Sequence, residues 1–309
     1  MAKIRPGKPR LGLVGTGVWA RTLHAPTAAE SDDIAFTSIF GRNEPVARDL
    51  AATFQVQAYT DFPTFLDSVD IVAFALTPDA QPAFALAAAD AGKHLLLEKP
   101  VARDHGTANE IAERLERKGS ASVVFFTQLL LPRVKRWVDD AAAAGGWLSA
   151  RVESFAQTLS DPNNAFYPTD WRRRLGALWD VAPHSVALLC LVLGDVVEVA
   201  AMRSRKQLVQ LTLSHSSGTI SSVAATLDAP VALPGSTVLF GLAGANVLPP
   251  SLDWYVDAKN AYRLALAWLS AAAQGTSSPI RLDARFGAHI TAILAAAERS
   301  IDSGQRIRM

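Results

Sequence analysis

The chain has 309 residues and a mass of 33.0 kDa, with half of its residues apolar and 19% charged, which excludes a disordered chain and is long enough for two domains. Thirty basic and 29 acidic residues leave a net charge of +1. Such a balance creates no field that would gather nucleic acid or an anionic membrane surface. We therefore expect neither nucleic acid nor a membrane as a partner.

The cysteine content and the N-terminal sequence indicate in which cell compartment the protein is expected. Cys190 is the only cysteine, which excludes a disulfide within the chain and a cysteine-ligated metal site. The sequence also contains no H-x-x-x-H pattern and no dense cluster of carboxylates, so it does not suggest a metal site. The N-terminus lacks the apolar stretch of a signal peptide, and the most apolar window, 181–199, contains proline, histidine and two acids. We expect a cytoplasmic, globular protein without a metal.

Strand-like and helix-like stretches alternate through the first 125 residues. Strands are expected at 10–14, 34–40, 71–76, 94–97 and 122–126. Helices are expected at 79–91 and 104–118, each followed by a glycine that can end it. Near-continuous apolar strands separated by helices predict that residues 1–125 form a domain built on a doubly wound parallel sheet.

The pattern changes after residue 125. Strands with short turns are expected at 148–157, 196–203, 208–215, 219–227 and 236–242, and the rest of 228–254 contains several prolines and is expected to be irregular. Helices are expected at 257–274 and 283–303. Residues 126–309 are therefore predicted to form an α+β domain with a large, mostly antiparallel sheet.

A glycine-rich loop follows the first expected strand and has the form G-x-G-x-x-A. The first glycine allows a tight turn, the second lets backbone amides approach a pyrophosphate, and the alanine permits close packing of helix on strand. An ordinary glycine turn is the alternative. The cofactor-binding residues predicted here are Gly15, Thr16, Gly17, Val18, Trp19 and Ala20.

The end of the second expected strand indicates which dinucleotide binds. NAD-binding folds usually place a carboxylate there for the ribose 2′-hydroxyl, but Asp32 and Asp33 precede the strand and Arg42 follows it. A guanidinium suits a 2′-phosphate, so NADP is favoured over NAD. The alternative is a solvated arginine in a loop.

Two further groups of residues carry possible chemistry. Lys99 follows the fourth strand, and the next residue, Pro100, holds it in an extended segment where it could donate to a substrate oxygen; a plain surface lysine is the alternative.

Asp180 and His184 share a helix face if one helix includes both, or Asp180 lies in the approach to a helix that starts near Pro183. A carboxylate near an imidazole suits a general base, although a structural contact is equally possible. The other histidines are expected to lack acidic partners.

These residues together resemble the Gfo/Idh/MocA family of NAD(P)-dependent oxidoreductases. The resemblance runs from the glycine loop through Thr77-Pro78 and the A-G-K-H stretch that leads to Glu98-Lys99-Pro100, and ends at the D-x-G-x-H-like stretch 180–184. It implies that residues 1–125 are a dinucleotide-binding Rossmann domain, that the second domain has a large sheet often used for oligomer contacts, and that the active site lies between the domains. It also places Thr77, Pro78 and Glu98 among the cofactor-binding residues.

The resemblance implies roles for the candidate catalytic residues. Lys99 would polarise the substrate oxygen, His184 would move the hydroxyl proton, and Asp180 would orient both. Trp171 and Arg172 are candidates for the substrate wall, with ordinary packing and a surface charge as the alternatives.

The sequence departs from the family pattern at Ala182, at Pro82, where many members have histidine, and at 128–132, where many have an Arg-Phe pair. These departures favour a neutral or more apolar substrate.

The sequence therefore predicts an NADP-preferring oxidoreductase that transfers a hydride between nicotinamide and a carbinol or carbonyl carbon of a sugar, polyol or related small molecule. A reductase of a C=N bond or of a tetrapyrrole is one alternative. A non-catalytic nucleotide-binding regulator or interaction protein of the same fold is another. The resemblance also implies a homodimer or homotetramer formed through the second sheet.

Overall fold

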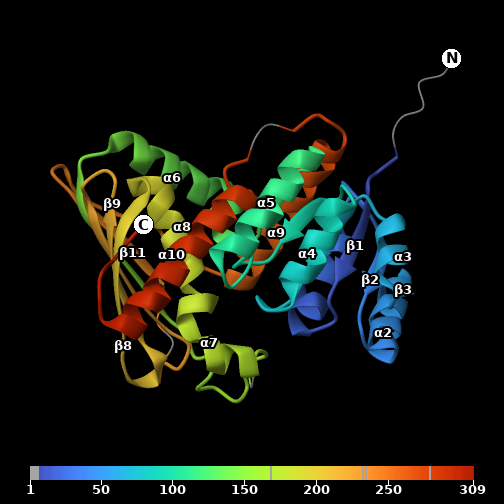
Figure 1. Ribbon diagram of the computed structural model, residues 1–309, viewed down its shortest axis with the longest axis horizontal. Helices are drawn as coiled ribbons and strands as arrows, with labels where there is room; N and C mark the ends of the chain where they lie inside the picture. The colour runs from blue at the N-terminus through green and yellow to red at the C-terminus, as the bar shows by residue number, and fades with distance from the viewer. Residues whose placement is uncertain (1–6, 168, 232, 234, 278–279) are drawn as a thin grey trace. The chain divides into compact units, whose positions relative to one another are not determined.

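The computed structural model describes residues 7–167, 169–231, 233, 235–277 and 280–309 (Figure 1). The chain forms two compact units. Unit 1 contains the described residues up to Thr127 together with Tyr255–Ala288, and unit 2 contains Gln128–Trp254 and His289–Met309. The first of these boundaries lies two residues from the predicted one, but 255–288, which the sequence analysis assigned to the second domain, packs with the first.

Unit 1 is built on a six-stranded parallel sheet with the order β3-β2-β1-β4-β5-β6. This is the strand order of the doubly wound dinucleotide-binding fold, which confirms the predicted Rossmann domain. Its strands are β1 (Arg10–Val14), β2 (Ala35–Phe40), β3 (Gln57–Tyr59), β4 (Ile71–Phe74), β5 (His94–Leu97) and β6 (Ser122–Val124). The edge strand β3 was not predicted from the sequence.

Helices connect these strands, and several begin at a side-chain cap. The side chains of Asn43, Asp61 and Asp104 each accept a hydrogen bond from the backbone amide three residues later, which satisfies a free donor in the first helical turn. In Figure 1, α2 and α3 lie beside β2 and β3. These helices of unit 1 are α1 (Ala25–Ala29), preceded by a π-helical turn (Ala20–His24), α2 (Glu44–Phe54), α3 (Phe62–Asp67), α4 (Gln81–Asp90) and α5 (His105–Lys118).

Helix α9 (Trp254–Ala273) packs in unit 1 through a stripe of small and aromatic residues. Its buried side chains recur at positions 258, 261, 262, 265, 266 and 269, the spacing of one helix face. Tyr262 contacts Phe125 with ring centroids 5.4 Å apart, and Ser270 donates to the carbonyl oxygen of Asp33 at 2.7 Å. At the helix surface, Lys259 and Arg263 both pair with Glu30. These contacts explain why 255–288 packs with the first unit.

Unit 2 is built on a seven-stranded sheet with the order β12-β11-β7-β10-β9-β8-β13. Strands β7 and β10 pair in parallel and the other neighbours pair antiparallel, which confirms the predicted mostly antiparallel sheet. Strand β12 lies in the stretch that was expected to be irregular. The strands are β7 (Trp147–Phe155), β8 (Val196–Arg203), β9 (Val209–His215), β10 (Ile220–Thr226), β11 (Ser236–Gly241), β12 (Gly244–Val247) and β13 (Ile307–Arg308).

Helices cover one face of this sheet. Alternate residues such as Ser221, Val223 and Ala225 of β10 are buried beneath the helices, whereas Ile220 on the opposite face is 52% exposed. In Figure 1, α6, α8 and α10 lie on the same side of the strands. The helices are α6 (Pro132–Ala144), α7 (Asp170–Asp180), α8 (Ala182–Leu193) and α10 (Ala284–Ser303), the last of which begins in unit 1.

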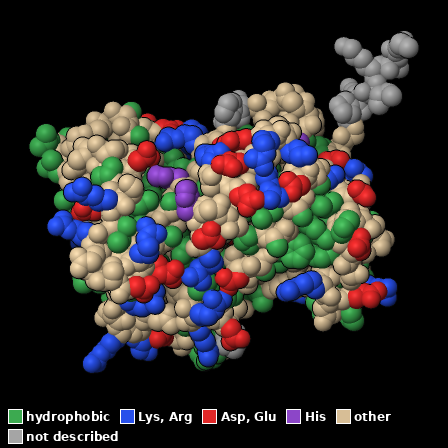
Figure 2. Space-filling model, viewed as in Figure 1, with side chains coloured by type: hydrophobic (Ala, Val, Ile, Leu, Met, Phe, Trp, Pro, Cys, Tyr) green, Lys and Arg blue, Asp and Glu red, His purple; other side chains and the backbone are tan. Residues whose placement is uncertain are grey.

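Helices α7 and α8 together pass a length and composition test for a membrane span. The stretch Asp170–Leu193 has 24 residues, and 89% of its most apolar window is buried inside the protein. Core helices of water-soluble proteins pass the same test. On the face seen in Figure 2, Lys and Arg side chains are interspersed with Asp and Glu side chains.

Candidate active site

The loop that follows β1 begins with a backbone conformation that requires glycine. Gly15 has a φ of +127°, and a Cβ at this position would lie 2.5 Å from the carbonyl oxygen of Ala75. The amide of Gly15 donates to the carbonyl oxygen of Phe40 at 3.0 Å. The first glycine of the predicted phosphate loop is therefore fixed between the end of β2 and the segment after β4.

Gly17 lies where the helix after this loop begins. Residues 18–29 are helical throughout, and Ala20 is fully buried, so the helix packs closely in the unit. Gly17 is exposed, and a Cβ there would meet no described atom within 4 Å. The missing side chain leaves open the space beside the first helical amides, where a Rossmann fold holds a pyrophosphate. The residues present therefore fit a dinucleotide.

The end of β2 carries an arginine that has no acidic partner. Arg42 is exposed and makes no hydrogen bond or ion pair with any described residue. Asn43 caps α2, and the nearest acid in the sequence, Glu44, pairs with Arg48. The guanidinium of Arg42 is therefore available at the position where the sequence analysis expected a contact with a 2′-phosphate.

Two more predicted segments follow strands of the same sheet. Thr77 accepts the amides of Ala80 and Gln81 at 3.0 Å, so Thr77-Pro78 forms the turn between β4 and α4. Glu98 and Lys99 follow β5; Glu98 is buried and Lys99 is half-buried. The ends of β1, β4 and β5 all lie at the carboxyl edge of the parallel sheet, which is the ligand edge of this fold.

A direct hydrogen bond joins the phosphate-loop helix to the segment of Lys99. The indole Nε1 of Trp19 donates to Glu98 Oε1 at 2.9 Å. Glu98 Oε2 accepts the backbone amide of Lys99 at 3.3 Å. The carboxylate of Glu98, which the sequence analysis assigned to cofactor binding, thus points into the interior of unit 1, and the structure brings Trp19 and the Lys99 segment together.

In unit 2, Asp180 and His184 lie on either side of a helix junction. Asp180 ends α7, and α8 begins at Ala182 with Pro183 as its second residue, so Asp180 lies in the approach to the helix that carries His184. This is the second of the two arrangements that the sequence left open. Asp180 is buried, and its Oδ2 accepts from Arg172 Nε at 2.7 Å.

Arg172 is held by aromatic rings as well as by this carboxylate. Its guanidinium carbon lies 4.4 Å from the ring centroid of Trp171 and 4.8 Å from that of Phe166. Its side chain is only 15% exposed. The packing of Arg172 between two rings orients the guanidinium that pairs with Asp180, a contact that the sequence analysis did not predict.

Two histidines that were expected to lack acidic partners have them. His24 Nε2 lies 3.1 Å from Glu98 Oε1, and His289 Nε2 lies 3.5 Å from Asp195 Oδ1. The expectation was wrong for both because each partner is distant in the sequence. Sequence reasoning therefore missed the contact of His24 with Glu98, a predicted site residue.

Three other titratable groups are structural. Burial lowers the pKa of His94 and of His215. The His215 ring lies 2.8 Å from both the carbonyl oxygen of Gly194 and the hydroxyl of Ser221, which satisfies both nitrogens of a neutral imidazole. Burial raises the pKa of the Cys190 thiol to about 12, so this thiol is not a nucleophile. Among the described residues, no group of three or more His, Cys, Asp or Glu side chains could hold a metal.

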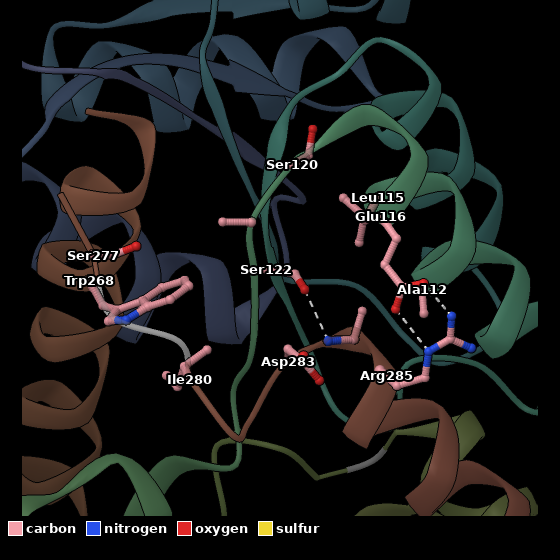
Figure 3. Close-up of a pocket in the computed structure, with 12 residues that line it drawn as sticks. Ala112, Leu115, Glu116, Ser120, Ser122, Trp268, Ser277, Ile280, Asp283 and Arg285 are labelled. Atoms are coloured by element: carbon pink, nitrogen blue, oxygen red, sulfur yellow. Dashed lines mark hydrogen bonds and ion pairs between the residues drawn. The ribbon is translucent and has the colours of Figure 1, made fainter. Parts of the chain in front are cut away.

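A pocket of about 330 Å³ in unit 1 contains none of the predicted site residues (Figure 3). It lies between α5 and the segment that follows α9. The ion pair of Arg285 with Glu116 borders it, and Ser122 Oγ accepts the amide of Ala284 at 3.0 Å. Because Ser122 is the first residue of β6, the pocket borders the amino edge of the sheet, opposite the phosphate loop.

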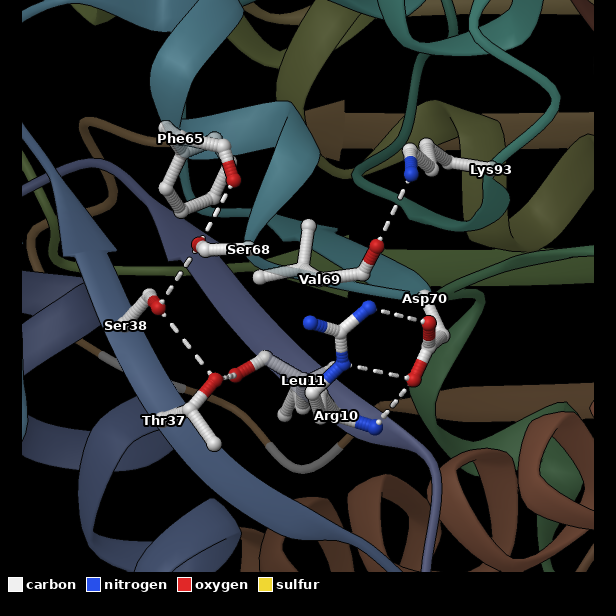
Figure 4. Close-up of polar contacts among 9 residues, drawn as sticks. All are labelled: Arg10, Leu11, Thr37, Ser38, Phe65, Ser68, Val69, Asp70 and Lys93. Atoms are coloured by element: carbon white, nitrogen blue, oxygen red, sulfur yellow. Dashed lines mark hydrogen bonds and ion pairs between the residues drawn. The ribbon is translucent and has the colours of Figure 1, made fainter.

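Polar contacts at the same amino edge fasten the strands to one another (Figure 4). Arg10, at the start of β1, donates to Asp70 from Nη2 at 2.7 Å and from its backbone amide at 2.9 Å, and this guanidinium lowers the pKa of the Asp70 carboxyl. Lys93 Nζ donates to the carbonyl oxygen of Val69 at 2.9 Å. Lys93 belongs to the A-G-K-H stretch, so this part of the family resemblance is structural.

Comparison with known proteins identifies the first unit. Residues 9–126 match a family model described as "Oxidoreductase family, NAD-binding Rossmann fold". The chain is 26% identical over 199 residues to Oxidoreductase P35 of Formosa agariphila, covering 61% of each chain. It is 31% identical over 173 residues to levoglucosan dehydrogenase of Pseudarthrobacter phenanthrenivorans, covering 52% of this chain and 43% of that protein. These matches span less than two thirds of either relative.

A solved structure shares the fold over nearly the whole chain. GenD2 from gentamicin A biosynthesis, in complex with NAD, superposes with a TM-score of 0.85 at 20% identity, covering 98% of this chain and 97% of that one. At this identity the likeness supports the fold of the described residues and not a shared substrate.

Proposed function

We propose that this protein, which belongs to the Gfo/Idh/MocA oxidoreductase family through its residues 9–126, transfers a hydride between a nicotinamide cofactor and a carbinol or carbonyl carbon of a sugar, polyol or related small molecule. The observation that carries the proposal is the hydrogen bond from Trp19 to Glu98, which places the glycine loop beside the segment of Lys99 at one edge of the sheet. The predicted phosphate loop and the half-buried residue Lys99 are thereby brought together.

When bound, the nicotinamide would accept or supply the hydride. The protein would bind the pyrophosphate at Gly15–Ala20, with the backbone amides after Gly17 as donors. Arg42 would bind a 2′-phosphate, so we propose NADP as the preferred dinucleotide. Support comes from the exposed, unpaired guanidinium at the end of β2, although GenD2 is described in complex with NAD.

The catalytic roles follow from the chemistry of three side chains. The Lys99 ammonium would donate a hydrogen bond to the substrate oxygen and stabilise the negative charge that develops there. During oxidation, His184 would take the proton of the substrate hydroxyl and, in the reverse direction, return it. Asp180, held by Arg172, would orient the groups around that oxygen. Trp171 and Arg172 would border the substrate.

The first experiment is a pair of fluorescence titrations with NADPH and NADH. We expect tighter binding of NADPH, and we expect Arg42→Ala to weaken NADPH binding about tenfold while leaving NADH binding unchanged. Arg48→Ala is the matched control, since Arg48 is also exposed but pairs with Glu44. Preference for NADH would refute the role of Arg42, and binding of neither would favour the non-catalytic interaction protein over the enzyme.

The second experiment tests the reaction itself. Neutral sugars, anhydrosugars and polyols would be screened with the preferred dinucleotide, because a relative is levoglucosan dehydrogenase and the chain lacks the arginine expected near 128–132. On any substrate found, Lys99→Ala and His184→Ala should each lower kcat at least about a hundredfold. Unchanged turnover in either variant would refute the assigned role.

We also propose that the open face of the unit 2 sheet forms the contact of a homodimer or homotetramer. Ile220, Phe240 and Met202 on this face are 52%, 42% and 71% exposed. Ile220 and Phe240 lie in one row across the strands, with Ser149 between them. Exposed apolar side chains that are neighbours on a protein surface can mark an interface. Light scattering would test this: a monomeric protein at micromolar concentration would refute it, and Ile220→Asp should lower the mass of an oligomer.

A further inference from the structure

The carboxylate of Glu98 is the centre of an interior hydrogen-bond cluster in unit 1. Its residue is 7% exposed. Oε1 accepts from Trp19 Nε1 at 2.9 Å and lies 3.1 Å from His24 Nε2, while Oε2 accepts the amide of Lys99 at 3.3 Å. Since a carboxylate only accepts, Nε2 of His24 carries the hydrogen of that bond.

His24 is fully buried and lies in the π-helical turn after the phosphate loop. Its ring packs against Tyr262, with centroids 4.6 Å apart, and against Phe125 at 5.9 Å. Neither His24 Nδ1 nor the Tyr262 hydroxyl has a hydrogen-bond partner among the described residues. The single polar anchor of the His24 ring is therefore Glu98, and single π-helical turns often occur at functional sites.

A second side chain holds the same segment from α4. The amide group of Gln81 is fully buried. Its oxygen accepts from the backbone amide of Glu98 at 2.8 Å, and its Nε2 donates to the carbonyl oxygens of Glu98 at 2.9 Å and Val101 at 3.0 Å. The backbone on either side of Lys99 is thus fixed by Gln81, and the side chain before Lys99 is fixed by Trp19 and His24.

We propose that Trp19, His24 and Gln81 are positioning residues for Lys99, acting through Glu98. The proposal rests on the proposed function, because it assigns these residues to the lysine of that reaction. Each of these hydrogen bonds restrains the Glu98–Val101 segment, so the side chain of the half-buried residue Lys99 starts from one fixed backbone position relative to the phosphate loop. Without them the same side chain would sample several positions.

The test uses substitutions that delete one donor and keep the packing. Trp19→Phe removes the indole N–H and keeps an aromatic ring, and Gln81→Leu removes the amide at similar volume. Trp137→Phe is the matched control, since Trp137 Nε1 also donates to a side chain at 2.9 Å, in unit 2. Thermal unfolding would show that each variant is folded, and His24→Asn would be added where it folds.

Two readouts separate positioning from loss of the fold. The first is the rate of reductive methylation of Lys99 in the protein without cofactor, measured by mass spectrometry relative to exposed Lys135. We expect Trp19→Phe and Gln81→Leu to change this ratio at least about twofold and Trp137→Phe to leave it unchanged. The second is turnover, where we expect kcat to fall about tenfold with KM within about twofold.

The outcomes also distinguish this proposal from the proposed function. If wild-type protein binds neither dinucleotide, the proposed function fails, but the methylation ratio still reports whether the cluster positions Lys99. If the dinucleotide binds and turnover is found, yet both variants match Trp137→Phe in methylation and in kcat, the positioning role is overturned. A rise in KM with unchanged kcat would also overturn it, because that result indicates substrate binding.

Discussion

Replacing the two loop glycines with alanine should affect different properties: dinucleotide binding at Gly17 and stability at Gly15. At Gly17, a Cβ would meet no described atom within 4 Å, so the free energy of unfolding should stay within about 0.5 kcal/mol of wild type. The added methyl group would fill the space beside the first helical amides, where the pyrophosphate is proposed to lie. We expect Gly17→Ala to weaken NADPH binding at least about tenfold, which is roughly 1.4 kcal/mol.

At Gly15 the same substitution should damage the fold. The φ of +127° is a conformation that costs an alanine about 1–3 kcal/mol. A Cβ would also lie 2.5 Å from the backbone oxygen of Ala75, and a backbone oxygen cannot rotate away as a flexible side chain can. We therefore expect Gly15→Ala to lose at least about 3 kcal/mol of stability.

Both variants would be measured by denaturant unfolding and by fluorescence titration with NADPH, using protein of the same preparation. Gly41→Ala provides an additional comparison, because its Cβ would also be crowded, at 2.8 Å from Thr16 Cγ2 and 3.1 Å from Ala47 Cβ, but by side-chain atoms and not by backbone. Gly17→Ala with wild-type affinity would refute the phosphate-loop assignment. A Gly15→Ala protein as stable as wild type would show that the steric argument is wrong.

Three further measurements follow from buried groups. Because burial raises the pKa of Cys190 to about 12, native protein should resist alkylation at pH 8 and react only when unfolded, as mass spectrometry would show. Burial lowers the pKa of His215, so the neutral ring stabilises the fold above the unfolded pKa of about 6.5. The free energy of unfolding should therefore fall as the pH falls below that value, and it should fall less steeply with pH in His215→Gln. Arg172→Ala leaves the buried Asp180 without this guanidinium and should cost about 3 kcal/mol in denaturant unfolding, more than Arg172→Lys; equal losses would contradict the pairing argument.

The strands that were predicted with the right bounds are those whose apolar runs end at glycine or a charge. Arg10–Val14, His94–Leu97 and Val196–Arg203 were expected at the bounds that the structure has. Strand β3, Gln57–Tyr59, was missed because three half-exposed residues at a sheet edge carry no apolar pattern. The placement of α9 in unit 1 was missed for a different reason, since its alanine-rich stripe would suit either unit.

The glycine loop could be read from the sequence because backbone geometry restricts it to one residue type. The cluster around Glu98 could not. A buried histidine or glutamine is recognised only by the partner it meets, and the partners of His24 and Gln81 lie 74 and 17 residues away in the sequence. In the sequence, His24 resembles any other core residue of a helix, and Gln81 resembles a solvated residue at a helix start.

The stretch from A-G-K-H to Glu98-Lys99-Pro100 has one part at each edge of the unit 1 sheet, and the two parts make different contacts. Lys93 and Glu98 lie at opposite ends of β5, which is only four residues long, so the stretch that carries the resemblance spans the sheet from one edge to the other. At the amino edge Lys93 ties a turn to β5 through a backbone carbonyl, and at the carboxyl edge Glu98 ties the lysine segment to the phosphate loop. Because a parallel sheet places its ligands at the carboxyl edge, we assign the first half of the motif to stability and the second half to the proposed chemistry. Both halves of the motif therefore support the fold, but only the second half, Glu98-Lys99-Pro100, supports the proposed activity.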